Sequence, residues 1–329
     1  MSALLEVRNL RTTFPGALRP LPVVDDISFS LARGEVLALV GESGSGKSMT
    51  ALSILRLVPK PGQVVAGEVM LAGEDLLQLP VTQMRRVRGA RIAMIFQEPM
   101  TCLNPVVAVG AQVMEAIQLH DSMSKVDARA RARELFAEVG IPDPDARLDA
   151  YPHHLSGGLK QRVMIAMALS TRPEILIADE PTTALDVTVQ AQILALLRNL
   201  QRDRGMAILL ITHDLGIVNE LADRVAVMYA GRLVEVAERK ALLSDPLHPY
   251  TQGLLRSIPA LSRAGERLPE IPGVVPSPDQ WPAGCRFSTR CPLRFEPCAE
   301  LFPEEIRPAA GRRVWCHEVE RSMGEKGAS

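Results

Sequence analysis

A glycine-rich run at residues 41–48, GESGSGKS, constrains this chain more than any other feature. It follows the apolar segment EVLALV, which predicts a strand, and precedes MTALSILRLV, which predicts a helix. In that context the run fits the pattern G-x-x-x-x-G-K-S/T. Its glycines let the backbone wrap closely around phosphate groups, and exposed N–H groups at the start of the helix attract their negative charge. The sequence therefore predicts a phosphate-binding loop, called the phosphate loop below, in an α/β fold.

The side chains of this loop suit a nucleotide bound with magnesium. Lys47 can reach the β- and γ-phosphates, and the Ser48 hydroxyl can ligate Mg²⁺. The residues expected to bind nucleotide here are Gly41, Ser43, Gly44, Gly46, Lys47, Ser48 and Met49. The alternative is a glycine-rich turn that only caps a helix, but a chance match to the whole pattern has a probability on the order of 1% in a chain of this length.

An apolar strand ending in two carboxylates, ILIADE, occupies residues 175–180. Asp179 suits the coordination shell of magnesium, and Glu180 can polarise an attacking water. Acidic residues often end strands, so this pattern alone is weak evidence. Together with a phosphate loop upstream it becomes strong evidence for a site that binds a nucleotide with magnesium and activates water.

Strand-like and helical segments alternate along most of the chain. Strands are expected at residues 4–8, 24–31, 35–40, 67–73, 91–96, 174–179, 206–212 and 224–229. Helical patterns occupy 107–172, with Gly140 as a C-cap, and 187–205, which ends at Gly205. This order predicts an α/β domain over residues 1–245 with an inserted helical subdomain at about 107–172. At 246–329 the prolines multiply, which predicts a loop-rich extension.

Composition excludes several function classes. The net charge is −1 and aromatic residues make up 4% of the chain, which argues against nucleic acid as a partner. No apolar run approaches the roughly 18 residues of a membrane span, and the N-terminus lacks the apolar stretch of a signal peptide. We therefore expect a cytosolic protein.

The run LSGGLKQR at 155–162 makes the pattern specific, because with it the chain resembles the ATP-binding cassette (ABC) ATPases over about residues 1–245. The resemblance implies a RecA-like core with an inserted helical subdomain. By position, it implies Gln97 as the Q-loop glutamine, Ser156, Gly157 and Gly158 as the signature, Asp179 and Glu180 as Walker B, Asp186 as the D-loop aspartate, His213 as the switch histidine, and Phe14 as the aromatic that stacks on adenine.

The resemblance implies a mechanism in which ATP is bound between two cassettes. Ser156 and its two glycines, opening a helix, form a second phosphate-binding terminus that completes the site of a facing subunit. Glu180, His213 and Gln97 are the expected catalytic residues; Gln97, Ser48 and Asp179 are the expected Mg²⁺ ligands. One departure is Leu159, which stands where the signature usually has glutamine. Because the serine and both glycines are intact, we expect the composite site to work.

Three further stretches resemble the ATPases of bacterial oligopeptide and dipeptide importers, with the D-type ATPases of dipeptide permeases most similar. They are QEPMTCLNP (97–105), HPYTQGLL (248–255) and CRFSTRCPLRFEPC (285–298). The resemblance implies a sister ATPase subunit as heterodimer partner, two membrane permease subunits, an extracytoplasmic substrate-binding protein acting indirectly, and a place at the cytoplasmic face of the bacterial inner membrane. Residues 98–116 are the expected lining of a groove for a permease coupling helix.

Four of the five cysteines lie in the last forty-five residues of the chain, at Cys285, Cys291, Cys298 and Cys316. A reducing cytosol disfavours disulfides, so metal or redox chemistry is expected there. The family resemblance implies a [4Fe–4S] cluster, for which four thiolates are the right number. A zinc site and unligated thiols are the alternatives; zinc sites more often have closely paired cysteines. Cys102 stands where relatives have serine and is expected to be structural.

Other functions stay open at this stage. The cargo could be another small solute, such as glutathione or a metal chelate. A non-transport ABC ATPase acting on nucleic acid or ribosomes is less consistent with the single cassette and with the lack of sustained heptads between Lys47 and Ser156. A metal-binding module with an inactive cassette conflicts with the intact catalytic residues. His153 and His154 match no role.

Overall fold

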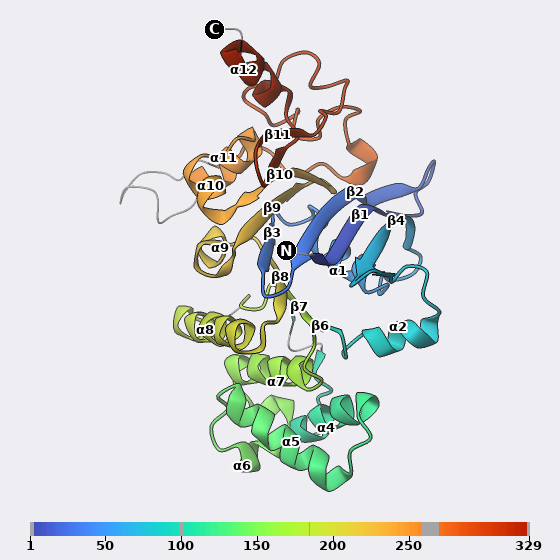
Figure 1. Cartoon of the computed structure of the whole chain (residues 1–329), viewed down its shortest axis with the longest axis vertical. Helices are drawn as coiled ribbons and strands as arrows, with labels where there is room; N and C mark the ends of the chain where they lie inside the picture. Colours follow the sequence, from blue (N-terminus) through green and yellow to red (C-terminus); the bar gives the residue numbers. More distant parts are fainter. Residues whose placement is uncertain (1–2, 99–101, 184, 258–269, 328–329) are drawn as a thin grey trace. The chain divides into compact units, whose positions relative to one another are not determined.

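The computed structural model describes residues 3–98, 102–183, 185–257 and 270–327 (Figure 1). By its internal contacts the chain divides into two units. Unit 1 comprises Ala32–Glu35 and Gln78–Leu210, and unit 2 comprises Ala3–Leu31, Val36–Leu77 and Ile211–Ser329. No helix in the described part of the chain combines the length and apolar character that a membrane span needs.

Unit 2 begins with an antiparallel sheet. Its strands are β1 (Ala3–Phe14), β2 (Leu21–Ala32), β4 (Gln63–Leu71) and β5 (Glu74–Asp75), in the order β2-β1-β4-β5. Leu5 and Val7 of β1 are buried and pair with Leu71 and Val69, so apolar side chains from both strands share one face, as the two-residue period of a strand requires. The strands at 4–8, 24–31 and 67–73 are confirmed, although each is longer than its apolar core.

The second sheet of unit 2 carries the phosphate loop. Of the eight strands of this sheet, those that lie in unit 2 throughout are β3 (Val36–Val40), β9 (Arg224–Tyr229), β10 (Arg232–Glu238), β12 (Arg312–Val314) and β11 (Ile306–Ala309), in the order β11-β12-β10-β9-β3. β3 is parallel to β9, and every residue of β3 is buried, which fits a strand covered on both faces. The accompanying helices are α1 (Lys47–Ile54), α9 (Leu215–Leu221) and α10 (Arg239–Ser244).

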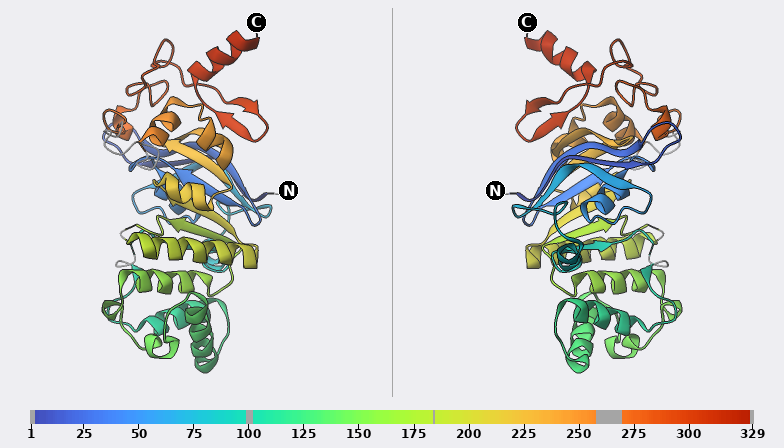
Figure 2. Two further views of the ribbon diagram at one scale, coloured as in Figure 1. Left: turned by 90° about the vertical axis from the view of Figure 1, so that its left-hand side faces the viewer. Right: turned by 90° about the vertical axis from the view of Figure 1, so that its right-hand side faces the viewer.

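The extension, residues 246–329, is loop-rich where it is described, as expected. Its elements are α11 (Pro249–Arg256), a single 3₁₀ turn at Pro278–Gln280, the hairpin β11–β12 and α12 (His317–Gly327). Both views of Figure 2 show the hairpin and α12, drawn in red, next to each other. A small core joins them: Val314, Cys316 and Val319 are buried together, with Leu247 and Ile306 against them. β12 pairs with β10, so the extension adds two strands to the sheet.

Unit 1 contains parallel strands and a helical bundle. Its elements are α2 (Val81–Val87), β6 (Ile92–Ile95), α4 (Val109–His120), α5 (Lys125–Glu138), α6 (Pro144–Leu148), a 3₁₀ turn at Pro152–His154, α7 (Gly157–Leu169), β7 (Ile175–Asp179), α8 (Val187–Arg204) and β8 (Ala207–Thr212), whose last two residues pass into unit 2. β6 pairs with β7 in parallel, and β8 follows in the order β8-β7-β6. α4, α5 and α7 pack on one another between residues 109 and 169 (green in Figure 1).

Two glycines end helices of unit 1 as predicted. Gly205 caps α8 in the left-handed conformation, with φ 61°. Gly140 follows the last turn of α5 with φ 74°, the position at which a left-handed residue is favoured. The helical pattern of 107–172 is thereby resolved into four helices and a 3₁₀ turn. The short helix α2 carries too few residues to show a periodic signal and was not predicted.

Candidate nucleotide-binding site

The phosphate loop connects β3 to α1, as its sequence predicts. Gly46 is the N-cap of α1 and has φ 101°, a conformation that favours glycine. A Cβ atom at Gly46 would also lie 2.5 Å from the backbone oxygen of Val23. Gly46 is therefore required both by backbone conformation and by space. The loop is held at its start, where Ser45 N donates to Glu42 O at 3.2 Å, and at its end, where Thr50 N donates to Gly46 O at 2.9 Å.

Lys47 folds back over the loop that precedes it. Its ammonium Nζ donates to the carbonyl oxygens of Gly41 at 2.8 Å and Glu42 at 3.0 Å, and the residue is only 5% exposed. A buried ammonium fixed in this way places a positive charge within reach of a phosphate bound by the loop. Ser48 and Met49 are half-buried, whereas Ser43 and Gly44 are exposed.

In unit 1 the expected base and the expected Q-loop glutamine are brought together. The strand β7 is buried throughout and ends at Asp179, which is itself buried. Glu180 follows with φ 46°, a conformation that non-glycine residues adopt chiefly at strained functional positions. Its Oε2 accepts hydrogen bonds from Gln97 Nε2 at 3.0 Å and from Thr183 Oγ1 at 2.8 Å. Thr183 was not predicted as a site residue, although its place three residues after Glu180 is a local signal.

The expected signature residues open α7. Ser156 is the N-cap, and its Oγ accepts a hydrogen bond from the backbone N–H of Leu159 at 3.4 Å. Because Leu159 takes part through its backbone, this cap does not depend on the side chain at position 159. A Cβ atom at Gly158 would lie 2.6 Å from Val189 Cγ1, so glycine is needed for α7 to approach α8.

The remaining expected residues lie at element ends. Asp186 is the N-cap of α8 and accepts from Val189 N at 2.9 Å. His213 is exposed and directly follows β8. Phe14 ends β1, and its ring packs against Gly62, where a Cβ atom would lie 2.5 Å from Phe14 Cζ. Phe14, His213 and the phosphate loop belong to unit 2, whereas Gln97, Glu180, Asp186 and the signature belong to unit 1.

Comparisons with known proteins identify the family of this chain. Residues 24–183 match the ABC transporter family model, and residues 234–298 match the model of the oligopeptide/dipeptide transporter C-terminal region. The oligopeptide transport ATP-binding protein AppD of Bacillus subtilis is 49% identical over 99% of this chain and 100% of its own length. The dipeptide transport ATP-binding protein DppD of Escherichia coli is 50% identical over 96% of each chain.

The chain belongs to the ATP-binding subunits of peptide ABC transporters. Among solved structures, the dimeric ABC transporter cassette MJ0796 superposes with a TM-score of 0.65 at 26% identity, covering 71% of this chain and 98% of that one. CbiO1 of Clostridium perfringens, part of the ABC transporter complex cbiONQ, gives 0.63 at 27% identity and covers 74% and 92%. The expected P-loop ABC fold and peptide-importer family are thus confirmed, and the protein is an ATPase. Matches to transporter subunits over nearly the whole length disfavour a non-transport ABC ATPase.

In this ABC ATPase, Glu42 of the phosphate loop contacts the extension. Arg290 makes a bidentate ion pair with Glu42, at 2.8 and 3.0 Å, and Tyr250 Oη accepts a hydrogen bond from Glu42 N at 2.9 Å. Burial opposes the charge of Arg290, but its hydrogen bonds to Glu42 and Tyr229 outweigh this and raise its pKa. These contacts were not predictable from the sequence, because nothing near residue 42 indicates a partner more than 200 residues away.

Burial raises the pKa of three of the extension cysteines. The pKa of Cys285 is raised to about 12, chiefly by burial and further by the charges of Cys316, Cys291 and Cys298. Burial likewise raises the pKa of Cys316 to about 11 and raises that of Cys291. The contribution of the other three cysteines to the shift at Cys285 places the four thiols near one another, and none is in a disulfide.

The expected metal centre is not supported by the structure. In residues 3–98, 102–183, 185–257 and 270–327, no three His, Cys, Asp or Glu side chains are placed to hold a metal ion. Cys102 is exposed, so a role in packing is also not supported.

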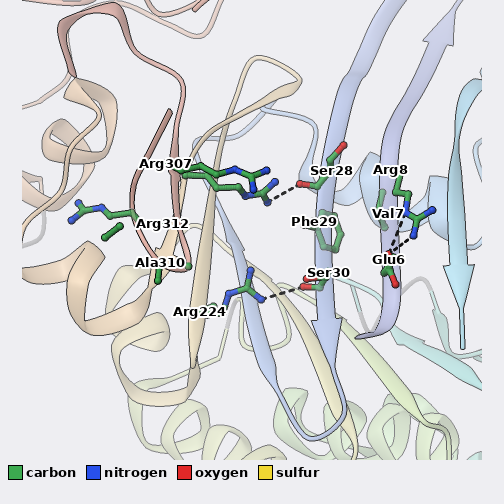
Figure 3. Close-up of a pocket in the computed structure, with 13 residues that line it drawn as sticks. Glu6, Val7, Arg8, Ser28, Phe29, Ser30, Arg224, Arg307, Ala310 and Arg312 are labelled. Carbon is green, nitrogen blue, oxygen red and sulfur yellow. Dashed lines mark hydrogen bonds and ion pairs between the residues drawn. The ribbon is translucent and has the colours of Figure 1, made fainter. Parts of the chain in front are cut away.

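A cavity of about 730 Å³ lies in unit 2 between β2 and the hairpin of the extension (Figure 3). Five arginines line it, and they are already engaged: Arg224, for example, donates to Ser30 O at 3.4 Å, and Arg8 pairs with Glu6 at 2.6 Å. Its described lining includes no residue of the phosphate loop. Arg313 donates to Ser28 O at 2.9 Å, so this region joins the hairpin to the first sheet.

Proposed function

We propose that this chain hydrolyses ATP in a pair of ABC cassettes and thereby drives the import of di- or oligopeptides through membrane permease subunits. The observation that carries the proposal is the fixed carboxylate of Glu180, which is held by Gln97 and Thr183 at the end of a buried strand in a chain with an intact phosphate loop. AppD and DppD, which are about half identical to this chain, are transport ATP-binding proteins for oligopeptides and dipeptides.

The residues present fit ATP bound with Mg²⁺. The phosphate loop offers a helix N-terminus and a buried ammonium for the phosphates. Ser48, Asp179 and Gln97 supply the oxygen donors that magnesium prefers, and the ion would neutralise charge that develops on the phosphates. Glu180 takes the proton of the attacking water, and His213 orients that water against the γ-phosphate. Phe14 stacks on the adenine, and Asp186 contacts the opposite cassette.

The signature and the segment after Gln97 are proposed to face partners. Ser156, Gly157 and Gly158 complete the ATP site of a sister ATPase in a heterodimer. Residues 98–116 receive a coupling helix of the permease; 99–101 lie outside the described residues. Gln112 fixes the backbone at Asn104 in the described part of this segment. Its Oε1 accepts a hydrogen bond from Asn104 N at 2.9 Å, and its Nε2 donates to Asn104 O at 3.0 Å. We place the assembly at the cytoplasmic face of the inner membrane, with a substrate-binding protein delivering cargo from outside.

The test is ATP turnover and peptide uptake by the complex of this chain with its partners in membranes. Glu180→Gln should lower turnover by roughly 10²- to 10⁴-fold, the usual contribution of a general base, while ATP binding persists. Lys47→Ala should weaken ATP binding itself. Glu180→Gln turnover at the wild-type rate would remove Glu180 from the catalytic role. Uptake of glutathione or a metal chelate in place of labelled di- and oligopeptides would contradict the peptide assignment.

We also infer a [4Fe–4S] cluster on Cys285, Cys291, Cys298 and Cys316, with Zn²⁺ as the alternative. The support is that the charges of Cys291, Cys298 and Cys316 act on Cys285, which places the four thiols near one another, and that backbone N–H groups reach three of them: Phe287 N–H at Cys285, Leu293 N–H at Cys291 and Glu318 N–H at Cys316. Each donor lies two residues after its cysteine, and N–H bonds of this kind stabilise bound thiolates.

Anaerobic purification with assays of iron, acid-labile sulfide and zinc tests this inference. About four irons and four sulfides per chain are expected for a [4Fe–4S] cluster. One zinc and no colour would replace the cluster by the alternative. A metal-free protein that binds neither metal on reconstitution would contradict both.

A further inference from the structure

Glu42, the second residue of the phosphate loop, is held by two groups from the extension. The Arg290 guanidinium binds both carboxylate oxygens of Glu42, at 2.8 and 3.0 Å, and only 4% of the Arg290 side chain is exposed. Tyr250, which is fully buried, accepts the backbone N–H of Glu42 at 2.9 Å. Both the side chain and the backbone of Glu42 are thus fixed by residues from a region outside the ATPase core.

Arg290 is itself held rigidly in place. Its Nε donates to Pro272 O at 2.8 Å, and Nη2 donates to Ile271 O at 3.1 Å. Its Nη1 also reaches Tyr229 Oη at 3.4 Å. A planar guanidinium with this many fixed partners has little freedom, so it determines where the Glu42 carboxylate lies. Lys47 in turn donates to the carbonyl of Glu42, so the position of Glu42 bears directly on the phosphate-binding lysine.

A second arginine of the extension supports the phosphate loop at Ser45, through two intervening residues. The buried Arg286 donates to the carbonyl oxygen of Ala230 and pairs with Asp25. The next residue, Gly231, donates its N–H to Ser45 O of the phosphate loop at 2.8 Å. Gly231 has no room for a side chain, because a Cβ atom there would lie 2.6 Å from the Trp281 ring. The extension therefore reaches Ser45 through the turn at Ala230 and Gly231.

We propose that Arg290 and Arg286 are positioning residues that hold the phosphate loop in its ATP-binding conformation, so that the extension sets the affinity for ATP. The two arginines lie between the first two cysteines of the extension: Arg286 follows Cys285, and Arg290 precedes Cys291. One short segment of chain thus fixes both Glu42 and Ser45. The proposal rests on the function proposed above and adds a role for the extension within the same site.

The test compares variants of the full chain in ATP binding and in turnover with its partners. Arg290→Gln should raise the Kd and the KM for ATP about tenfold, because small displacements of binding groups have effects of this order or larger. The kcat at saturating ATP should change by less than about twofold, since Arg290 touches no reacting atom. Arg290→Lys, which keeps the charge but not the fork, should recover part of the affinity.

A double-mutant cycle connects the effect to Glu42. Glu42→Gln should weaken ATP binding about as much as Arg290→Gln, and the double variant should be no worse than either, because the two residues act as one pair. Arg294→Gln is the matched control: Arg294 lies in the same loop, is exposed, and should leave the affinity unchanged.

Two outcomes separate this inference from the function on which it rests. If Arg290→Gln lowers the melting temperature but leaves the Kd for ATP unchanged, the arginine is only structural and the inference is wrong. Should Arg290→Gln fail to fold, Glu42→Gln and Arg290→Lys decide in its place, and unchanged affinity in both overturns the inference. If Lys47→Ala also binds ATP as well as wild type, the proposed function itself fails.

Discussion

The two halves of the candidate site are supported in different ways. In unit 1 most of the supporting contacts are local: Ser156 and Asp186 cap their own helices, and Thr183 binds Glu180 three residues away. The exception is Gln97, which binds Glu180 from 83 residues earlier in the chain. In unit 2 the phosphate loop is supported from far along the chain, since Tyr250 lies 208 residues and Arg290 lies 248 residues after Glu42. The difference indicates that a short motif can encode the chemistry of a site while its rigidity comes from elsewhere.

This difference leads to distinct energetic expectations. A helix cap is one hydrogen bond at a surface, and its loss costs on the order of 1 kcal/mol and stays local. A buried ion pair ties distant segments together, and removal of one partner leaves an uncompensated charge in a medium of low polarity. Variants in the two halves should therefore differ in the size of their effects on the free energy of unfolding.

The largest loss of stability is expected from replacement of Asp25. This carboxylate pairs with Arg11 at 2.8 Å, with Arg232 at 3.0 Å and with the buried Arg286. Burial would raise the pKa of Asp25, but the arginines outweigh it and lower the pKa. Asp25→Asn leaves these guanidinium groups without their anion and should cost roughly 3–5 kcal/mol in urea denaturation. Asp26→Asn is the control, because Asp26 is exposed and should change stability by less than about 0.5 kcal/mol. Equal losses in both variants would contradict a buried network.

The contrast between local and distant contacts also determines which features can be predicted from the sequence. The phosphate loop, the buried strands β3, β7 and β8, and the helix ends at Gly140 and Gly205 are each specified within a few residues. The pairing of β12 with β10 was not predictable, because a three-residue strand shows no alternation. The structure places the start of α11 after His248, but no local signal in the sequence shows that Tyr250 reaches Glu42.

An intermediate effect on stability is expected from the protonation of His248, the N-cap of α11. Its Nδ1 accepts the backbone N–H of Tyr250 at 3.0 Å, and burial lowers its pKa from 6.5 to about 3. Below pH 6.5 the unfolded chain takes up a proton that the folded chain excludes until about pH 3, so stability falls as the pH falls through this window. Since each pKa unit corresponds to about 1.4 kcal/mol, the loss between about pH 7.5 and pH 5 should be about 2 kcal/mol.

Chemical denaturation across this pH range measures that loss. His248→Asn keeps an acceptor for the Tyr250 N–H and does not titrate, so it should flatten the dependence. The carboxylates with lowered pKa values, Asp25, Asp149 and Glu174, contribute only nearer pH 4, which leaves the upper part of the range to His248. An unchanged slope in His248→Asn would assign the pH dependence to other groups.

The smallest change in stability is expected from loss of the helix cap at Ser156, for which the same unit offers a matched control. Ser124 caps α5 in the same unit, accepting Asp127 N at 3.2 Å, but lies outside the candidate site. Ser156→Ala and Ser124→Ala should each cost about 1 kcal/mol in the free energy of unfolding. Only Ser156→Ala should lower ATP turnover in the assembled transporter, because Ser156 is proposed to bind the phosphates held by the sister subunit.

Neither cap variant should change the affinity of the isolated chain for ATP, because both residues lie in unit 1 and the phosphate loop is supported within unit 2. Arg290→Gln should show the opposite pattern, with weaker ATP binding already in the isolated chain. A Ser156→Ala variant that turns over ATP like Ser124→Ala would reduce Ser156 to a helix cap. A Ser156→Ala variant with weakened ATP binding in the isolated chain would show that the two halves are coupled more tightly than their contacts within each unit indicate.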